Sequence, residues 1–186
     1  MKCSFILVLI LVALAFPSFA ADQNEYLEEL LKRANEGNVA AQFRLGMWYS
    51  DDEGDIKDDK EAVKWFRMAS EQGHAGSQHS LGWMYYIGWG VIKDYKEAVK
   101  WYRMAAEQGI AGSQSNLGLM YLRGEGVIED YVEAYKWTLL AEMNGKDVVN
   151  NKELLRDRMT KEQMGEAQRL AKEYVARKEW QKPINP

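Results

Sequence analysis

The chain has 186 residues, enough for one or two domains, and its apolar and charged fractions are those of an ordinary globular protein. Lysine and arginine number 24 against 28 aspartate and glutamate residues, which gives a formal net charge of −4. This balance, with no basic stripe, argues against nucleic-acid binding and against attraction to an anionic lipid surface.

The first 20 residues are predicted to form a secretory signal peptide. Lys2 gives a positive start, residues 5–16 are almost wholly apolar, and the small residues Ser18 and Ala20 fit a cleavage site before Ala21. An uncleaved anchor is the alternative, but the apolar run is shorter than the ~20 residues that a membrane span needs. We therefore expect an exported mature chain, periplasmic or secreted, with no membrane span.

The single cysteine, Cys3, lies within this predicted signal peptide. The mature chain would then contain no cysteine and no disulfide, although exported proteins often use them. Its stability is expected to come from packing alone.

Residues 21–36 are predicted to form an N-terminal capping helix. The chain continues with repeated 36-residue units, each predicted to contain two helices, and residues 21–36 align with the second of these helices. Gly37 accordingly lies 36 positions before Gly73. A helix in this place would cover the open end of a stack of units, as repeat arrays require.

From this point the chain repeats itself every 36 residues, three times, without an insertion or deletion. A fixed period in this range is typical of stacked supersecondary units. The matching positions are Leu45, Leu81 and Leu117; Gly46, Gly82 and Gly118; Tyr49, Tyr85 and Tyr121; Asp58, Asp94 and Asp130; Trp65, Trp101 and Trp137; and Gly73, Gly109 and Gly145.

Each unit is predicted to consist of two antiparallel helices, and the middle unit shows the signals clearly. Asp94 and Glu97 form a capping box at the start of the second helix, and Gly109 supplies the left-handed residue that ends it. Gly82 lies inside the first helix, where glycine costs about 1 kcal/mol relative to alanine. We expect a close helix–helix approach to offset this cost, with Trp101 filling the space.

The middle unit resembles the Sel1-like repeat, a tetratricopeptide-like family. The positions that carry the resemblance are Ser77, Leu81, Gly82, Tyr85, Gly88, Gly90, Val91, Asp94, Tyr95, Ala98, Trp101, Tyr102, Ala105, Ala106 and Gly109. The resemblance implies an all-α fold, an α/α solenoid formed as a right-handed superhelix of helix–turn–helix repeats. It also implies a protein that binds other proteins or holds complexes together. The three units are placed at 37–73, 74–109 and 110–145.

The first unit departs from this pattern in its loop. Asp51, Asp52, Glu53 and Asp55 make the loop acidic, and the first loop glycine is missing. A calcium-binding loop is the alternative reading, but the spacing and the glycine turn of such a loop are absent. His74, beside Gly73, is expected to be a solvated loop residue.

Residues 146–180 are predicted to form C-terminal capping helices, and residues 181–186 a disordered tail. Thr160 and Gln163 form a second capping box. The segment resembles the terminal region that often follows such repeats in bacterial exported members.

The predicted partner site lies on the first helices, which line the concave side of a solenoid. Residues on the face opposite the core vary between the three units, and the central unit presents Trp and Tyr, residue types enriched at binding hot spots. The predicted partner-binding residues are Phe43, Met47, His79, Trp83, Tyr86, Ile87, Leu119, Leu122 and Arg123. Arg123 would pair with an anionic group. The alternative is that Phe43, Trp83 and Leu119 pack between adjacent units.

Nothing in the sequence predicts catalysis, a metal site or a cofactor. No nucleophile–base motif is present, and the two histidines have no cysteine to complete a zinc site. We expect a monomeric interaction scaffold with a protein or peptide partner. The alternatives are a weak hydrolase or penicillin-binding activity, as suggested for cysteine-rich relatives, and an inhibitor or host-directed secreted factor.

Overall fold

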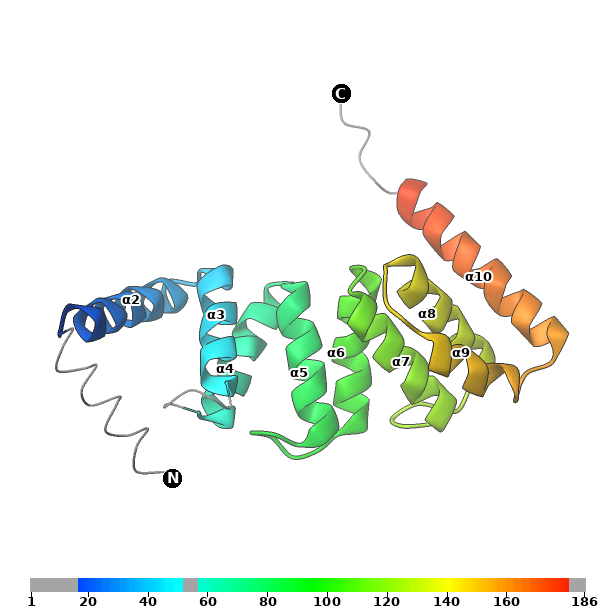
Figure 1. Cartoon of the computed structure of the whole chain (residues 1–186), viewed down its shortest axis with the longest axis horizontal. Helices are drawn as coiled ribbons and strands as arrows, with labels where there is room; N and C mark the ends of the chain where they lie inside the picture. The colour runs from blue at the N-terminus through cyan, green and yellow to red at the C-terminus, as the bar shows by residue number, and fades with distance from the viewer. Residues whose placement is uncertain (1–16, 52–56, 181–186) are drawn as a thin grey trace.

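The computed structural model describes residues 17–51 and 57–180, and every regular element in these ranges is an α-helix. Residues 1–16 of the predicted signal peptide, most of the acidic loop and the predicted tail 181–186 lie outside the described residues. Figure 1 shows the helices stacked in chain order in an elongated row. The helices are α2 (Pro17–Asn35), α3 (Val39–Ser50), α4 (Asp59–Glu71), α5 (Ala75–Ile87), α6 (Tyr95–Glu107), α7 (Ala111–Arg123), α8 (Tyr131–Met143), α9 (Val149–Arg156) and α10 (Lys161–Trp180).

Three helix pairs form the repeating units: α3 with α4, α5 with α6, and α7 with α8. Each second helix begins after an aspartate whose side chain accepts hydrogen bonds from the first turn; Asp94 Oδ1 accepts from the Lys96 and Glu97 amides at 2.8 and 3.1 Å. The Asp94 amide donates to the Tyr85 carbonyl at 3.0 Å and so joins the two helices of the unit.

The predicted capping box includes a hydrogen bond from the cap aspartate's amide to the glutamate three residues later. This part of the prediction is wrong for Asp58, Asp94 and Asp130, whose amides donate to carbonyls of the first helix. The Glu97 carboxylate does not reach back to the cap; it accepts from Trp101 Nε1 at 3.1 Å and from Lys100 Nζ at 3.3 Å. The Thr160–Gln163 box is reciprocal as predicted, because each residue's amide donates to the other's side chain, at 2.9 and 3.2 Å.

Close helix contact at the repeated Leu-Gly pair is confirmed, but the residue that fills the space is Tyr102 and not Trp101. A Cβ built on Gly82 would lie 2.8 Å from Cδ1 of Tyr102. Phe66 lies against Gly46 in the same way, whereas Thr138 and the Ala134 carbonyl lie against Gly118. An aromatic ring thus covers glycine backbone in the first two units.

The repeated tryptophan instead joins one unit to the preceding second helix. Trp101 packs with Ala62, Val63 and Phe66 of α4, and Trp65 packs with Leu30 and Ala34 of α2. Helix α2 therefore occupies the position of the second helix of a preceding unit. The hydrophobic residues of α2 in this contact lie from Leu27 onward.

A buried glutamine repeats at each junction between units. The Gln78 side chain donates to the Ser70 carbonyl at 3.1 Å and accepts from the Gln108 side chain at 2.8 Å. Gln42 and Gln114 do the same at the neighbouring junctions. Each glutamine thus gives a second donor to a carbonyl at a helix C-terminus, which also accepts from the amide of Gly37, Gly73 or Gly109.

Replacing Gln78 with leucine is expected to cost about 2 kcal/mol, because the two hydrogen bonds of this side chain, each contributing about 1 kcal/mol, are lost at the junction. Urea unfolding followed by circular dichroism measures the change. The control is Gln168→Leu, on the exposed surface of α10, which should change the free energy of unfolding by less than ~0.5 kcal/mol. Equal effects of the two substitutions would contradict a structural role for the buried glutamine.

Candidate functional site

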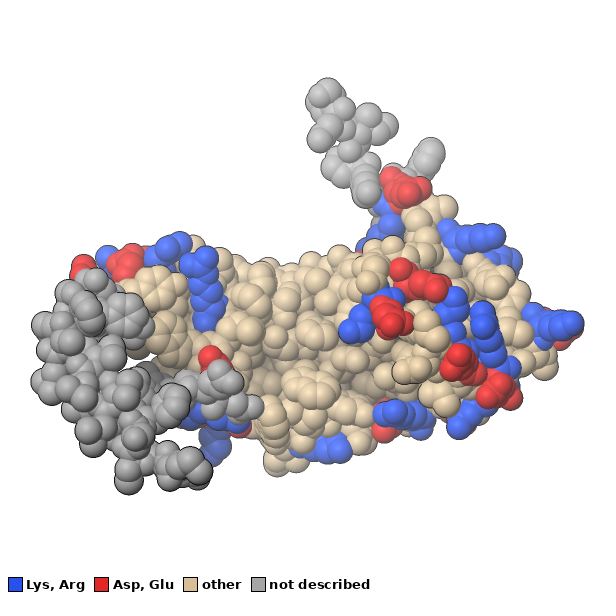
Figure 2. Space-filling model, viewed as in Figure 1, with Lys and Arg blue, Asp and Glu red and all other residues tan. Residues whose placement is uncertain are grey.

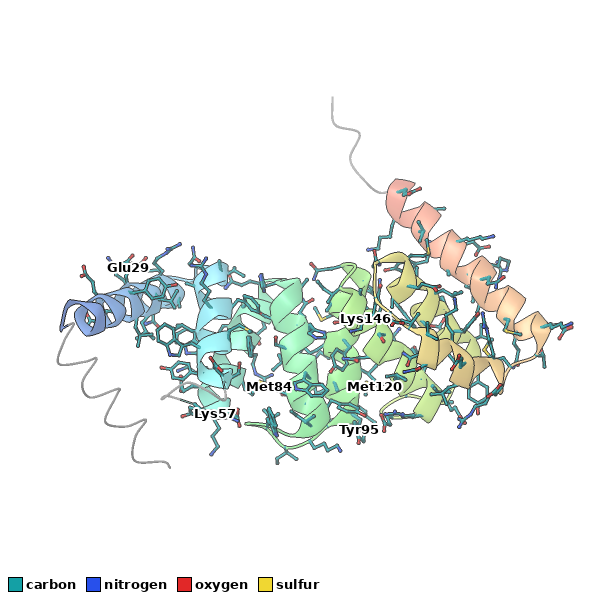
Figure 3. All side chains as sticks on the ribbon, in the orientation of Figure 1. Glu29, Lys57, Met84, Tyr95, Met120 and Lys146 are labelled. Atoms are coloured by element: carbon teal, nitrogen blue, oxygen red, sulfur yellow. The ribbon has the colours of Figure 1, made fainter. Side chains whose placement is uncertain are left out.

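Two hollows lie side by side between successive first helices. The α3–α5 hollow has a volume of about 230 Å³ and is lined by Met47, Ser50, Phe66, His79, Ser80, Trp83, Met84 and Trp89. The α5–α7 hollow has a volume of about 150 Å³ and is lined by Trp83, Tyr86, Tyr102, Asn116, Leu119, Met120, Arg123 and Glu125. Met84 and Met120, labelled in Figure 3, belong to the first and second hollow respectively.

Trp83 forms the ridge between the two hollows. Its side chain belongs to both linings and is 45% exposed, and its ring stacks on that of Tyr86 with centroids 6.0 Å apart. Met47 at the far side of the α3–α5 hollow is 49% exposed. These large side chains are exposed on α3 and α5, where Leu45 and Leu81 on the opposite face are completely buried, so both faces of these helices carry apolar residues.

The face has almost no net charge. Figure 2 shows that the middle of the molecule, over α5 and its neighbours, carries almost no lysine, arginine, aspartate or glutamate. Arg123 and Glu125 are the charged residues that line the two hollows, and their side chains are 3.9 Å apart. Arg123, which was predicted to pair with an anionic group of the partner, thus already has Glu125 of the same chain as an ion-pair partner.

Tyr86 connects these two charges at the rim of the α5–α7 hollow. Its hydroxyl donates to Glu125 Oε2 at 3.1 Å and accepts from Arg123 Nη1 at 3.3 Å. Partial burial, and then the Glu125 carboxylate, raise the pKa of the Tyr86 phenol, so the hydroxyl keeps its proton at neutral pH. The rim is thus a fixed network that holds the Tyr86 ring against Trp83.

His79 lies in the α3–α5 hollow and joins two units. Its Nδ1 is 2.7 Å from the Ser113 hydroxyl, and its ring lies 5.7 Å from that of Tyr102. Burial, and then the positive charge of Lys146, lower the pKa of this imidazole below its ordinary value of 6.5. The neutral ring is therefore the form that fits the folded chain.

Stability is expected to fall as pH drops below about 6.5, because the unfolded chain then binds a proton at His79 that the folded chain excludes. Urea unfolding at pH 7.5 and pH 5.5 measures this loss. The variant His79→Asn, which cannot titrate, should lose less stability over the same range. A variant with the same pH dependence as the original chain would contradict this origin of the effect.

The remaining predicted site residues are divided between the face and the core. Leu119 lines the α5–α7 hollow and is half-buried, whereas Ile87 is half-buried and lines neither hollow. Phe43 lies between units, with its ring 4.6 Å from that of His74 and 6.0 Å from that of Phe66. The inter-unit alternative is thus the arrangement observed for Phe43.

The placement of Leu122 on the open face is wrong. Its side chain is 4% exposed and packs with Tyr135, Leu155 and Met159. The C-terminal capping segment covers that side of α7. The position of Leu122 around its helix could not predict this contact, because the covering residues come from a distant segment. The prediction for His74 is also wrong: this residue is the N-cap of α5, and its Nδ1 accepts from the Ser77 amide at 3.1 Å.

The lining residues that were not predicted include Trp89, Tyr102, Asn116 and Glu125. Trp89 and Glu125 occupy one loop position in successive units, and this position varies between copies as the predicted face does. Variation between the three copies, if it had also been examined in the loops, would have identified both Trp89 and Glu125. Tyr102 belongs to a second helix, whereas the predicted partner site was confined to the first helices.

The described residues contain no group of three or more His, Cys, Asp or Glu side chains that could hold a metal ion. No helix in the ranges 17–51 and 57–180 is both long and apolar enough to cross a bilayer. The face instead offers two shallow hollows, a tryptophan ridge and few charges. This geometry defines a helical-repeat solenoid with an open surface on its first helices.

The family model for the Sel1 repeat matches residues 39–74, 75–110 and 111–146, which is more than half of the chain, so the chain belongs to the Sel1 repeat family. Proteins built from this repeat typically serve as non-catalytic scaffolds for protein interaction. No curated protein matches the chain.

Solved structures with the same fold include a Sel1 repeat protein from Oxalobacter formigenes. It shares 40% identity with a TM-score of 0.61, over 70% of this chain and 97% of that one. A protective antigen present in uropathogenic Escherichia coli strains shares 29% identity and a TM-score of 0.61, over 86% of this chain and 44% of that one. Cysteine-rich protein B from Helicobacter pylori, at 21% identity and a TM-score of 0.53 over 69% and 96%, is similar in fold.

Proposed function

We propose that this protein is an exported, non-catalytic adaptor that binds a peptide or protein segment across the first helices of its three repeats. The observation that carries the proposal is the pair of hollows on either side of the exposed Trp83. A segment lying across α3, α5 and α7 would place one side chain in each hollow and pack its backbone on the ridge.

The side chains on this face are of the types that dominate binding energy. Tryptophan, tyrosine and arginine are enriched at hot spots, and methionine adapts its shape to different partners. Trp83, Tyr86, Arg123 and Met47 supply all four types within one surface of almost no net charge. Covering Trp83 and Met47 would remove two half-exposed apolar side chains from water, which favours association.

The rigidity of the face supports the same function. Tyr86 is held by two hydrogen bonds, and His79 is fixed against Ser113 of the next unit. Side chains that are already ordered lose little conformational entropy when a partner binds. The stacked units thus present the hollows at a fixed spacing.

Site-specific photo-cross-linking tests the proposal. A benzophenone amino acid in place of Met47, which lines the α3–α5 hollow, should capture a protein partner in cells; the same amino acid in place of Met104, an exposed methionine of α6, should not. The intact mass of the recovered protein reports whether it begins at Ala21, as export with cleavage after Ala20 requires. Equal capture from both positions, or capture from Met104 alone, would place the partner on another surface.

A further inference from the structure

We propose that the α3–α5 hollow, between the Trp83 and Trp89 rings, binds an arginine side chain carried by the partner. This inference rests on the proposed function and names the residue type that this hollow selects. Three features support it: the aromatic faces that line the hollow, the lack of a cation among the described residues that line it, and the acidic segment beside it.

The walls of the hollow offer aromatic faces to a ligand. Trp83 and Trp89 are 45% and 43% exposed, so both present accessible ring surface. Tyr86 stacks on Trp83 and, of the two hollows, lines only the α5–α7 hollow, so the other face of Trp83 is turned to the α3–α5 hollow. The face of an aromatic ring carries partial negative charge and attracts a cation, and tryptophan does so most strongly.

The structure already contains one example of this attraction at Trp89. The ammonium group of Lys57, labelled in Figure 3, lies 4.8 Å from the centroid of the Trp89 ring. Lys57 does not belong to the lining of the hollow, so its ammonium contacts the ring from outside the hollow. The ring surface inside the hollow is thus left for a cation of the partner.

The described residues that line this hollow include no lysine or arginine. Burial, and then the charge of Lys146, lower the pKa of the lining residue His79, so its imidazole is uncharged at neutral pH. His79 lies in the first half of α5 and Trp89 follows the end of this helix, so Lys146 acts on the end of the hollow away from Trp89. A partner cation is therefore expected at the Trp89 end.

The chain segment 51–61 supplies negative charge at this end of the hollow. It contains seven acidic and two basic side chains, a net charge of −5. Asp51 directly follows Ser50, which lines the hollow. Further along the segment, the Asp59 carbonyl lies against Gly90 in the loop that follows α5. Charges within about 10 Å are only partly screened at physiological salt, so this segment favours a cationic occupant.

The size and polar groups of the hollow suit a guanidinium group. Its volume of about 230 Å³ exceeds that of a ~150 Å³ cavity that holds benzene, a larger group than guanidinium. A guanidinium group is planar and more weakly hydrated than an ammonium group, and it stacks on aromatic rings. Ser50 and Ser80 line the hollow, and their hydroxyl oxygens can accept hydrogen bonds from guanidinium N–H groups. The lining therefore matches arginine in shape as well as in charge.

The α5–α7 hollow provides an internal comparison, because it lacks these properties. Glu125 occupies the loop position of Trp89 one unit later, so Trp83 is left as the tryptophan of that lining. Arg123 lies 3.9 Å from Glu125 and already supplies a cation to the rim. A partner arginine is therefore expected to bind in the α3–α5 hollow and not in the α5–α7 hollow.

The test uses the full chain labelled with ¹³C at its methionine methyl groups and two pentapeptides that differ by one charge. The peptides are acetyl-Ser-Gly-Arg-Gly-Ser-amide and the same sequence with citrulline, the neutral isostere of arginine, at the centre. The Met47 and Met84 signals report on the α3–α5 hollow, and the Met120 signal reports on the α5–α7 hollow. The arginine peptide should shift the Met47 and Met84 signals in a saturable way, with an affinity about tenfold higher than that of the citrulline peptide.

The variant Trp89→Leu should reduce the affinity for the arginine peptide about fivefold and leave the affinity for the citrulline peptide nearly unchanged. The matched control is Ile92→Ala, an exposed position of the same loop, which should keep the full preference. Raising the sodium chloride concentration from about 50 to about 500 mM should weaken the binding of the arginine peptide alone, because it screens the acidic segment. Circular dichroism checks that both variants are folded.

Equal affinity of the two peptides for the original chain, which requires no variant, would overturn the inference. The absence of any shift at Met47 and Met84 would overturn it too, as would a larger shift at Met120 than at these two signals. A preference for arginine that survives Trp89→Leu unchanged would also contradict it.

These outcomes are separate from those of the cross-linking experiment. Capture of a partner at Met47 together with no preference for the arginine peptide would leave the proposed function standing and reject only the inference. Failure of capture at Met47 would reject the proposed function whichever peptide binds.

Discussion

Replacing Gly90 with alanine is expected to destabilise the protein by about 3 kcal/mol, the sum of two costs. Gly90 has φ +68°, in the left-handed region, where an alanine loses about 1 kcal/mol or slightly more. A Cβ at this position would also overlap the backbone carbonyl of Asp59 in the first turn of α4. A backbone group cannot swing away as a side chain can, so the overlap adds about 2 kcal/mol.

Two glycines separate these costs. Gly73 has φ +88° but open space around its Cβ position, so Gly73→Ala should cost only the conformational part, about 1 kcal/mol. Gly165 lies within α10 with open space and an ordinary φ, so Gly165→Ala should stabilise the chain by about 0.5–1 kcal/mol. Urea unfolding of the three variants measures the series. A Gly90→Ala chain as stable as the Gly73→Ala chain would show that the loop does not pack on the preceding unit.

The loop contact tested in this way is a property of the repeat. Gly126 lies against the Tyr95 carbonyl in the first turn of α6, as Gly90 lies against that of Asp59. The loops of the second and third units thus rest on the start of the second helix of the preceding unit. This contact and the Gln78 junction fix how the units stack, and they keep the two hollows at a constant separation.

The sequence predicted the repeating framework because caps and turns are local. An aspartate cap, a left-handed glycine and a buried leucine each act within a few residues, and the period shows them three times. The buried glutamines keep the same period, but a polar residue on a core-facing stripe does not identify its partner carbonyl. The hydrogen bond from Gln78 to the Ser70 carbonyl could therefore not be predicted from the sequence.

Contacts between helices were predicted less well because neighbouring residues point in different directions. Trp101 and Tyr102 are adjacent, about 100° apart around the helix, and both are apolar aromatics. The choice of which one covers Gly82 depends on the rotation of α6, which local patterns do not determine. Leu122 was misplaced for a similar reason, since its covering residues Leu155 and Met159 come from the C-terminal capping segment.

The candidate site was predicted in part because its centre lies on one helix. Trp83 and Tyr86 are three residues apart on α5, so helical phase alone places them on one face. Glu125 and Asn116 come from the next unit, and Tyr102 comes from the second helix α6. The Tyr86–Glu125 hydrogen bond, which spans 39 positions in sequence, depends on how two units stack and could not be read from either unit by itself.

The double variant Trp83→Ala, Tyr86→Ala is expected to lose at least about 100-fold in affinity for the partner, since two hot-spot aromatics each contribute about 2 kcal/mol or more. Both hollows lose a wall when Trp83 is removed, and the rim network of Arg123 and Glu125 loses its central hydroxyl. Neither residue belongs to the fully buried core, so helix content should be unchanged. The measurement is the amount of the cross-linked partner recovered by the variant in a pull-down.

The matched control is the double variant Ile92→Ala, Ile128→Ala. Both isoleucines are 91% exposed on the inter-helix loops and line neither hollow, so their removal deletes exposed apolar surface away from the face. This control should recover the partner as the original chain does. If the Trp83–Tyr86 variant is folded by circular dichroism and still recovers the partner, the ridge is not the binding surface. If both double variants lose the partner, binding depends on general surface hydrophobicity, and the tryptophan ridge has no special role.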